Sequence, residues 1–232
     1  MPFIFPQILK SEGGPQGGVF APLGEGVRGA SSPPPSPVTL IDGGMGQELL
    51  RRSGEDPHPL WATRVMIDHP GLVQSIHADY FAAGASVATT NTYALFHDRL
   101  VKFALAHRLD ALQTAALAEA HAARGAHGRG IIAGSIGPLV ASYRPDLFPP
   151  RKQAVADYSA IVARLAPHVD VLIGETVASL AHARALIDAA RGAAPDTPFW
   201  LSVTLEDRDG TQLRSGEPLA DLALLAGRVD AV

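Results

Sequence analysis

Short apolar runs alternate with longer amphipathic segments from residue 38 to the end of the chain. The short runs are nearly continuous in apolar, often β-branched residues, which is typical of parallel strands that are covered on both faces. They predict strands over residues 38–42, 86–90, 130–135, 169–174 and 199–204, with a sixth strand beginning at residue 229. Strands that alternate with helices in this way predict an α/β fold, either a doubly wound sheet or a (β/α)₈ barrel.

The segments between these runs carry apolar residues at helical spacing. Asp68-His69-Pro70 predicts an N-cap followed by a proline in the first turn of a helix, and Gly84 predicts the end of that helix. Further helices are predicted over residues 98–123 (as one helix or two), 152–165, 178–190 and 218–226. The nine histidines fall mostly in these helices or in loops, and we expect them to be surface residues.

Residues 1–37 have a different composition. The stretch from Ser11 to Pro37 is rich in Gly, Pro and Ser, and it cannot bury enough apolar surface to order itself. We interpret it as a flexible tail, and a start codon assigned too far upstream explains the same composition equally well. The folded domain is therefore expected to span residues 38–232.

Charge and cysteine content narrow the possible functions. The net charge of −4 and the scattered positive residues argue against a nucleic-acid or membrane partner. The chain has no cysteine, which excludes disulfides, a thiolate nucleophile and a Cys-ligated zinc within these 232 residues. No apolar run approaches the ~18 residues of a membrane span, and no secretory signal pattern is present. We therefore expect a cytoplasmic protein.

Polar residues follow several of the predicted strands, where both parallel folds place their reactive groups. After the first strand, residues 42–46 read Asp-Gly-Gly-Met-Gly, which is either a tight turn capped by Asp42 or a backbone that approaches a ligand closely. After the second, residues 89–93 read Thr-Thr-Asn-Thr-Tyr, which either bind a polar ligand or satisfy their own backbone. Glu175 follows the fourth strand, where a carboxylate needs a partner, and it is suited to an ammonium group, a metal or a role as base.

Taken in order, these segments resemble the homocysteine S-methyltransferase family. The matching segments are residues 42–49, 60–62, 77–85, 89–93, 133–138, 142–145 and 175–176. The resemblance implies a (β/α)₈ TIM barrel, of which residues 38–232 contain about five and a half βα units. It also implies a site for the amino-acid end of homocysteine, in which Asp42, Gly43 and Glu175 hold the ligand. The backbone of Met45 would line that pocket, and Asn91 and Thr92 would form its wall.

The chemistry of homocysteine agrees with this assignment. Asp42 and Glu175 suit the ammonium group, and the N–H groups of a glycine-rich turn suit the carboxylate. The resemblance implies transfer of a methyl group from S-methylmethionine, S-adenosylmethionine or a similar donor to the homocysteine thiolate, which gives methionine. No catalytic residue is assigned within this chain.

The resemblance also implies a zinc ion held by three cysteines, which in the family follow the point where this sequence ends. Because an incomplete barrel leaves sheet edges open, we expect the isolated chain to be unstable, to aggregate, or to need a complementing chain or an oligomer. Three interpretations stay open: a zinc-dependent methyltransferase whose sequence continues, a non-catalytic remnant with part of an amino-acid site, and a zinc-independent barrel enzyme with Glu175 as general base.

Overall fold

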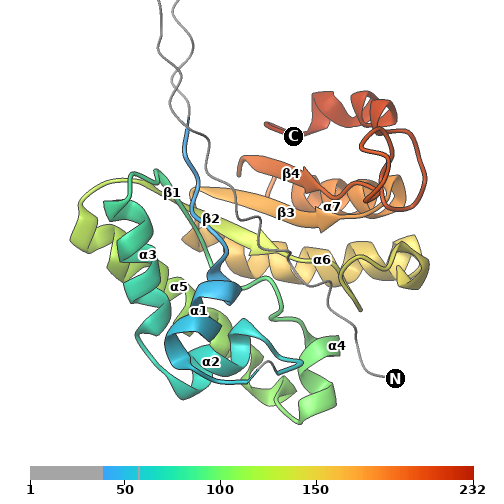
Figure 1. Cartoon of the computed structure of the whole chain (residues 1–232). Helices are drawn as coiled ribbons and strands as arrows, with labels where there is room; N and C mark the ends of the chain where they lie inside the picture. Colours follow the sequence, from blue (N-terminus) through green and yellow to red (C-terminus); the bar gives the residue numbers. More distant parts are fainter. Residues whose placement is uncertain (1–38, 57) are drawn as a thin grey trace, which may run out of the picture. The chain divides into compact units, whose positions relative to one another are not determined.

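Four parallel strands form the sheet of this protein, which a computed structural model describes over residues 39–56 and 58–232 (Figure 1). The strands are β1 (Val87–Thr89), β2 (Ile131–Ile136), β3 (Val171–Val177) and β4 (Phe199–Val203), and they lie in the order β1-β2-β3-β4. This confirms the α/β fold with a parallel sheet. The order follows the sequence without reversal, as in the winding of a (β/α)₈ barrel, whereas doubly wound sheets reverse at a switch point. The tail predicted over residues 1–37 lies outside the described residues.

The first and last predicted strands are shorter than expected. Ile41 forms a single parallel bridge with Val87, and Ala231 forms one with Trp200. Each bridge lies beside an outer strand of the sheet, so the sequential order continues on both sides of the four strands. Residues 39–42 pass directly into a glycine-rich turn, which leaves little extended backbone for pairing.

The four longest helices connect the strands and confirm the helical predictions there. They are α3 (Leu72–Ala82), α5 (Leu109–His127), α6 (Arg151–Leu165) and α7 (Leu180–Ala193). Helix α3 packs against α5, and α6 packs against α7 (Figure 1). Gly84, with a φ of 105°, follows the end of α3 as predicted. Within the described residues, none of the helices combines the length and the apolar character that crossing a membrane requires.

Several helix predictions were wrong in detail. Asp68 does not cap α3: it is the last residue of α2 (Ala62–Asp68), and α3 begins after Gly71, whose φ is 88°. Residues 98–123 are broken into α4 (His97–Leu100), two 3₁₀ turns, η1 (Val101–Phe103) and η2 (Ala106–Arg108), and the start of α5. The last predicted helix is a 3₁₀ helix, η5 (Leu219–Arg228), and shorter 3₁₀ turns occur at η3 (Pro145–Leu147) and η4 (Ala166–His168).

Helices α1 (Met45–Ser53) and α2 were not predicted. The first turn of α1 contains Gly46, and glycine disfavours a helix by about 1 kcal/mol relative to alanine. Packing stabilises the helix despite this low propensity, because Leu49 is fully buried in a cluster with Val73 and Ile76 of α3. Gly54, with a φ of 70°, ends α1 by donating its N–H to the Leu50 carbonyl.

The sheet buries both of its faces, and alternate residues of each strand point to opposite sides. The outer face packs against the helices through residues such as Ala88, Ile132 and Leu172. The inner face carries a separate apolar cluster formed by Val87, Ala133, Val171 and Ile173, with Trp200 packed against it. This alternation fixes which side chains at the strand ends face inward.

Candidate functional site

Three polar residues continue the inner face at the carboxyl ends of adjacent strands. Thr89 lies two positions after Val87, Ser135 two positions after Ala133, and Glu175 two positions after Ile173. Because side chains alternate along a strand, all three share the face of the apolar cluster. The result is a polar layer above an apolar floor, at the edge of the sheet where parallel α/β proteins place their ligands.

Asp42 joins this polar layer from the segment beside β1. Its backbone N–H donates to the Val87 carbonyl at 3.1 Å, which extends the sheet by one hydrogen bond. Its carboxylate accepts the Thr89 backbone N–H on Oδ2 at 2.7 Å and the Thr89 hydroxyl on Oδ1 at 2.6 Å. The side chain is only 3% exposed. Both carboxylate oxygens are therefore fixed by one residue, and each keeps acceptor capacity for a ligand.

Glu175 is the second carboxylate of the site. Its Oε1 accepts a hydrogen bond from the Ser135 hydroxyl at 2.5 Å. Burial raises the pKa of Glu175, the Ser135 hydrogen bond opposes this shift, and the charge of Asp42 raises the pKa further. The two carboxylates thus interact across the site. A ligand with a positive charge between them would relieve both the repulsion and the desolvation.

A bulge in β3 follows Glu175 directly. Thr176 has a φ of 56°, which is rare for a β-branched residue, and the pairing with β4 shifts register between Gly174 and Val177. The bulge returns Val177 to the outer apolar core. Beside it, the Tyr93 hydroxyl shares a hydrogen bond of 2.7 Å with Ser142, and burial raises the pKa of Tyr93. Thr176 therefore lies between the outer apolar core at Val177 and the polar side chains of Tyr93 and Ser142.

The glycine-rich turn leads into α1. A Cβ at Gly43 would lie 2.9 Å from the ring of Tyr80, so close packing of an aromatic side chain requires this glycine. Gly44 precedes the helix, and Met45, which is half-buried, is its first residue. The turn therefore places the N-terminus of α1 immediately after Asp42. The roles of Gly43 and Met45 toward a ligand stay predictions.

The loop after β1 satisfies many of its own polar groups. The Thr92 hydroxyl donates to the Ser135 carbonyl at 2.7 Å, and the Thr90 hydroxyl accepts the Ser135 N–H at 3.1 Å. The Asn91 amide contacts the Ala62 carbonyl at 3.4 Å. These bonds agree with a loop that satisfies its own backbone, and a place for Asn91 and Thr92 in the pocket wall stays a prediction.

Two histidines that were expected at the surface are buried. His77 of α3 is 0% exposed, and its Nδ1 lies 3.6 Å from Oδ2 of Asp42. His182 of α7 is 2% exposed, and its Nε2 lies 2.8 Å from the Tyr158 hydroxyl. Thr89 and Ser135 were not singled out individually, although Thr89 belongs to the loop over residues 89–93 that was a candidate for binding a polar ligand. Their signal was present in the sequence, since both continue the inward register of an apolar strand by two residues.

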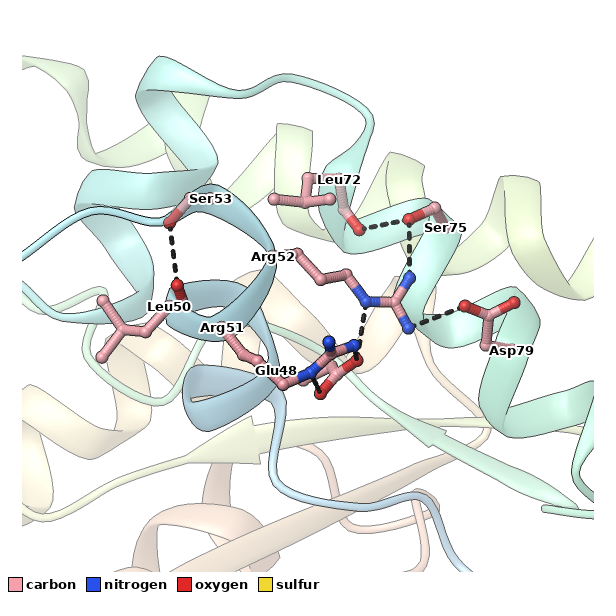
Figure 2. Close-up of polar contacts among 8 residues, drawn as sticks. All are labelled: Glu48, Leu50, Arg51, Arg52, Ser53, Leu72, Ser75 and Asp79. Carbon is pink, nitrogen blue, oxygen red and sulfur yellow. Dashed lines mark hydrogen bonds and ion pairs between the residues drawn. The ribbon is translucent and has the colours of Figure 1, made fainter.

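A network of charged side chains ties α1 to α3 (Figure 2). Arg52 bonds Glu48 at 2.7 Å within α1, and it reaches Asp79 at 2.7 Å and the Ser75 hydroxyl at 3.3 Å on α3. Hydrogen bonds from Arg51 and Arg52 lower the pKa of Glu48 to about 2. We refer to Glu48, Arg51, Arg52, Ser75 and Asp79 as the α1–α3 clamp. It helps to hold α3, which carries His77 and Tyr80, beside the turn that carries Asp42 and Gly43.

Comparisons with known proteins agree with this arrangement. The sequence model of the homocysteine S-methyltransferase family matches residues 39–232. The chain belongs to this family. It is 31% identical over 205 residues to the homocysteine S-methyltransferase YbgG of Bacillus subtilis and 33% identical over 219 residues to the homocysteine S-methyltransferase of Escherichia coli. These alignments cover 81% and 82% of the chain, and the chain spans 64% and 66% of the two relatives.

Solved structures of the same family share the fold. The metallated form of the homocysteine methyltransferase MmuM from Escherichia coli superposes with a TM-score of 0.75 at 30% identity. The match covers 84% of this chain and 73% of that structure. The family likeness therefore extends from the sequence motifs to the arrangement of the parallel sheet and its helices.

The resemblance places the three zinc-binding cysteines after residue 232, and the described residues offer no other zinc site. The sequence contains no cysteine. Across residues 39–56 and 58–232, no group of three or more His, Asp or Glu side chains is arranged to hold a metal ion. Asp42 and Glu175 form a group of only two carboxylates, and they accept hydrogen bonds from Thr89 and Ser135.

Proposed function

We propose that this chain forms the amino-acid end of a homocysteine S-methyltransferase site. The observation that carries the proposal is the pair of Asp42, which lies beside β1 and has a side chain only 3% exposed, and Glu175 of β3, whose pKa is raised by burial and by the charge of Asp42. An ammonium group has three donors and one positive charge, so it can bond both carboxylates and offset their repulsion. The α-ammonium of homocysteine meets this requirement.

The carboxylate of the amino acid needs donors on the opposite side of the ammonium. The first turn of a helix leaves its backbone N–H groups without partners inside the helix, and the helix dipole favours a negative charge there. Helix α1 begins at Met45, three residues after Asp42. The backbone at Gly43 and Met45 is therefore suited to the carboxylate, and Asn91 and Thr92 are placed by the proposal at the side of the ligand.

The proposed reaction is a displacement at a methyl carbon. The homocysteine thiolate attacks the methyl group of a donor such as a sulfonium, a new S–CH₃ bond forms, and the bond from the methyl to the donor breaks with its electron pair going to the donor. Methionine is the product. Residues of this chain bind and orient the nucleophile in this scheme, which supplies the effective concentration that an oriented reactant gains. No step is assigned to a metal, because the described residues do not fit one.

The proposal extends to the architecture. We infer that residues 38–232 form a sector of a (β/α)₈ barrel. Three features support this: the sequential strand order, the flanking bridges at Ile41 and Ala231, and the apolar inner face covered by a polar layer. The barrel would place Asp42 and Glu175 at its carboxyl-terminal face, where barrel enzymes hold their substrates.

Binding of homocysteine to the full 232-residue chain tests the proposal. Titration calorimetry under reducing conditions should detect L-homocysteine and should not detect 4-mercaptobutyrate, which lacks the ammonium group. Asp42→Asn and Glu175→Gln should each weaken homocysteine binding by about tenfold or more, because each removes a charged hydrogen-bond partner. Asp157→Asn, at an exposed position on α6, is the matched control and should bind as the wild type does.

Two results would contradict the proposal. Equal binding of both ligands would show that the ammonium is not recognised. Unchanged homocysteine affinity in the Asp42 and Glu175 variants would place the amino-acid end elsewhere. Binding without methyl transfer from S-methylmethionine or S-adenosylmethionine would leave the amino-acid site intact and would favour a non-catalytic binding role for this chain.

A further inference from the structure

The imidazole of His77 is the most unusual buried group outside the two carboxylates. It is 0% exposed, and within the described part of the chain neither of its ring nitrogens has a hydrogen-bond partner. Buried polar groups are nearly always satisfied, since an unmade hydrogen bond destabilises the folded state. A leucine at this position would fill a similar volume without that penalty. The histidine is therefore unexplained by packing alone.

The position of His77 relates it to the ligand site. Its Nδ1 lies 3.6 Å from Oδ2 of Asp42, which is beyond hydrogen-bond range by about half an ångström. The other contacts of that carboxylate come from Thr89 on β1. His77 therefore approaches Asp42 from helix α3, while Thr89 holds it from the sheet. The α1–α3 clamp, which engages Ser75 and Asp79 of α3, supports the placement of this helix (Figure 2).

We propose that His77 is a positioning residue that acts through Asp42. The imidazole presents an Nδ1–H to Oδ2 of Asp42, and the contact closes to a hydrogen bond when the ammonium of the amino acid binds to the same carboxylate. Polar contacts in ligand-free sites are often longer than those in the complex. His77 does not touch the substrate. It keeps the Asp42 carboxylate turned toward the ligand and offsets part of its repulsion with Glu175. The inference rests on the proposed function above.

A matched set of substitutions separates this role from a structural one. His77→Asn keeps an N–H donor near the place of Nδ1, whereas His77→Gln places its amide near Nε2. We expect the Asn variant to bind L-homocysteine within about twofold of the wild type, and the Gln and Leu variants to bind about five- to tenfold more weakly. The control is Ile76→Leu, because Ile76 is equally buried on the same helix but belongs to the apolar cluster with α1. It should bind normally.

Stability gives a second and independent readout. Because His77→Leu removes two unsatisfied polar atoms, its melting temperature should equal or exceed that of the wild type while its homocysteine affinity falls. A structural role predicts the opposite correlation, with binding lost in proportion to stability. Should the Leu variant fail to fold, the comparison of the Asn and Gln variants still decides the question, since both side chains are polar and of similar size.

A double-mutant cycle with Asp42→Asn completes the test. If His77 acts through Asp42, adding His77→Leu to Asp42→Asn should cause no further loss of affinity. The inference would be overturned if the double variant lost affinity by the product of the two single losses. It would also be overturned if His77→Gln bound homocysteine like the wild type. Both results require a wild-type chain that binds homocysteine, so they are distinct from a failure of the proposed function, in which the wild type itself does not bind.

Discussion

The Ser135 hydroxyl donates a hydrogen bond to Oε1 of Glu175, and so joins the carboxyl ends of β2 and β3 across the inner face of the sheet. This bond favours the ionised form of Glu175, while burial and the charge of Asp42 favour the protonated form. The charge of the site therefore depends on the balance between these effects. Among the described residues, Ser135 is the only side chain that donates a hydrogen bond to the Glu175 carboxylate.

Removal of the Ser135 hydroxyl should shift this balance. In Ser135→Ala the carboxylate of Glu175 loses its donor, so its pKa should rise further and the affinity for L-homocysteine near neutral pH should fall about three- to tenfold. Ser135→Thr keeps a hydroxyl and serves as the control. Calorimetric titrations of the three proteins measure the effect, and equal affinities would mean that the bond is structural only.

Homocysteine affinity should also depend on pH through Glu175. Because its pKa in the free protein lies above the ordinary value of 4.5, acidification protonates Glu175 before an isolated glutamate would titrate. A protonated Glu175 cannot offset an ammonium charge, so the dissociation constant should rise as the pH is lowered through that raised pKa. The measurement is a series of titrations from pH 8 down to pH 4, a range that extends below the ordinary value of 4.5. Glu175→Gln should flatten the profile, and a flat profile in the wild type would exclude this role for Glu175.

The sequence predicted the central strands of the sheet better than the strands at its two edges. Residues 130–135 and 169–174 are nearly continuous apolar runs, and such runs are typical of parallel strands covered on both faces. The predicted strands at 38–42 and 229–232 are similarly apolar, but only single bridges form within residues 39–42 and 229–232, because pairing at the edge of the sheet depends on neighbours and turn geometry. Helix α1 was missed because Gly46 opposes a helix locally, and packing of Leu49 against α3 outweighs this effect.

The site was predictable wherever a polar residue interrupts an apolar strand. Asp42 and Glu175 were predicted in this way, and the same rule extended by two residues from Val87 and Ala133 singles out Thr89 and Ser135. His77 could not be found, because a lone histidine at helical spacing is usually exposed. Its burial depends on tertiary contacts between α3 and the turn after Asp42, which no local pattern encodes.

Gly46 should tolerate no side chain. A Cβ at this position would overlap the indole ring of Trp61, whose own backbone is already held at a φ of 46°. We expect Gly46→Ala to lower the free energy of unfolding by about 1–3 kcal/mol, since overpacking outweighs the gain in helix propensity. Gly44→Ala is the control, because its Cβ would meet only the flexible side chain of Gln47, at 3.6 Å. Urea denaturation of both variants decides whether the glycine at 46 is required for packing.

His182 should make the folded state sensitive to mild acid. Its ring is buried between Tyr158 and Phe148, and burial lowers its pKa from the ordinary value of 6.5 to about 3. Between these two values the unfolded chain binds a proton that the folded chain excludes, so the free energy of unfolding falls as the pH is lowered below 6.5. The slope approaches about 1.4 kcal/mol per pH unit, and the loss between pH 7 and pH 5 is about 2 kcal/mol.

His182→Gln isolates this contribution from those of other titrating groups. The variant should be less stable than the wild type at pH 7, because the hydrogen bond to Tyr158 and the stacking are altered. The difference should shrink by about 2 kcal/mol at pH 5, where the wild type alone excludes a proton from a buried ring. His107→Gln, at an exposed position in η2, should keep the wild-type slope. Parallel slopes for the wild type and His182→Gln in urea denaturation would show that His182 is protonated in the folded state as readily as in the unfolded chain.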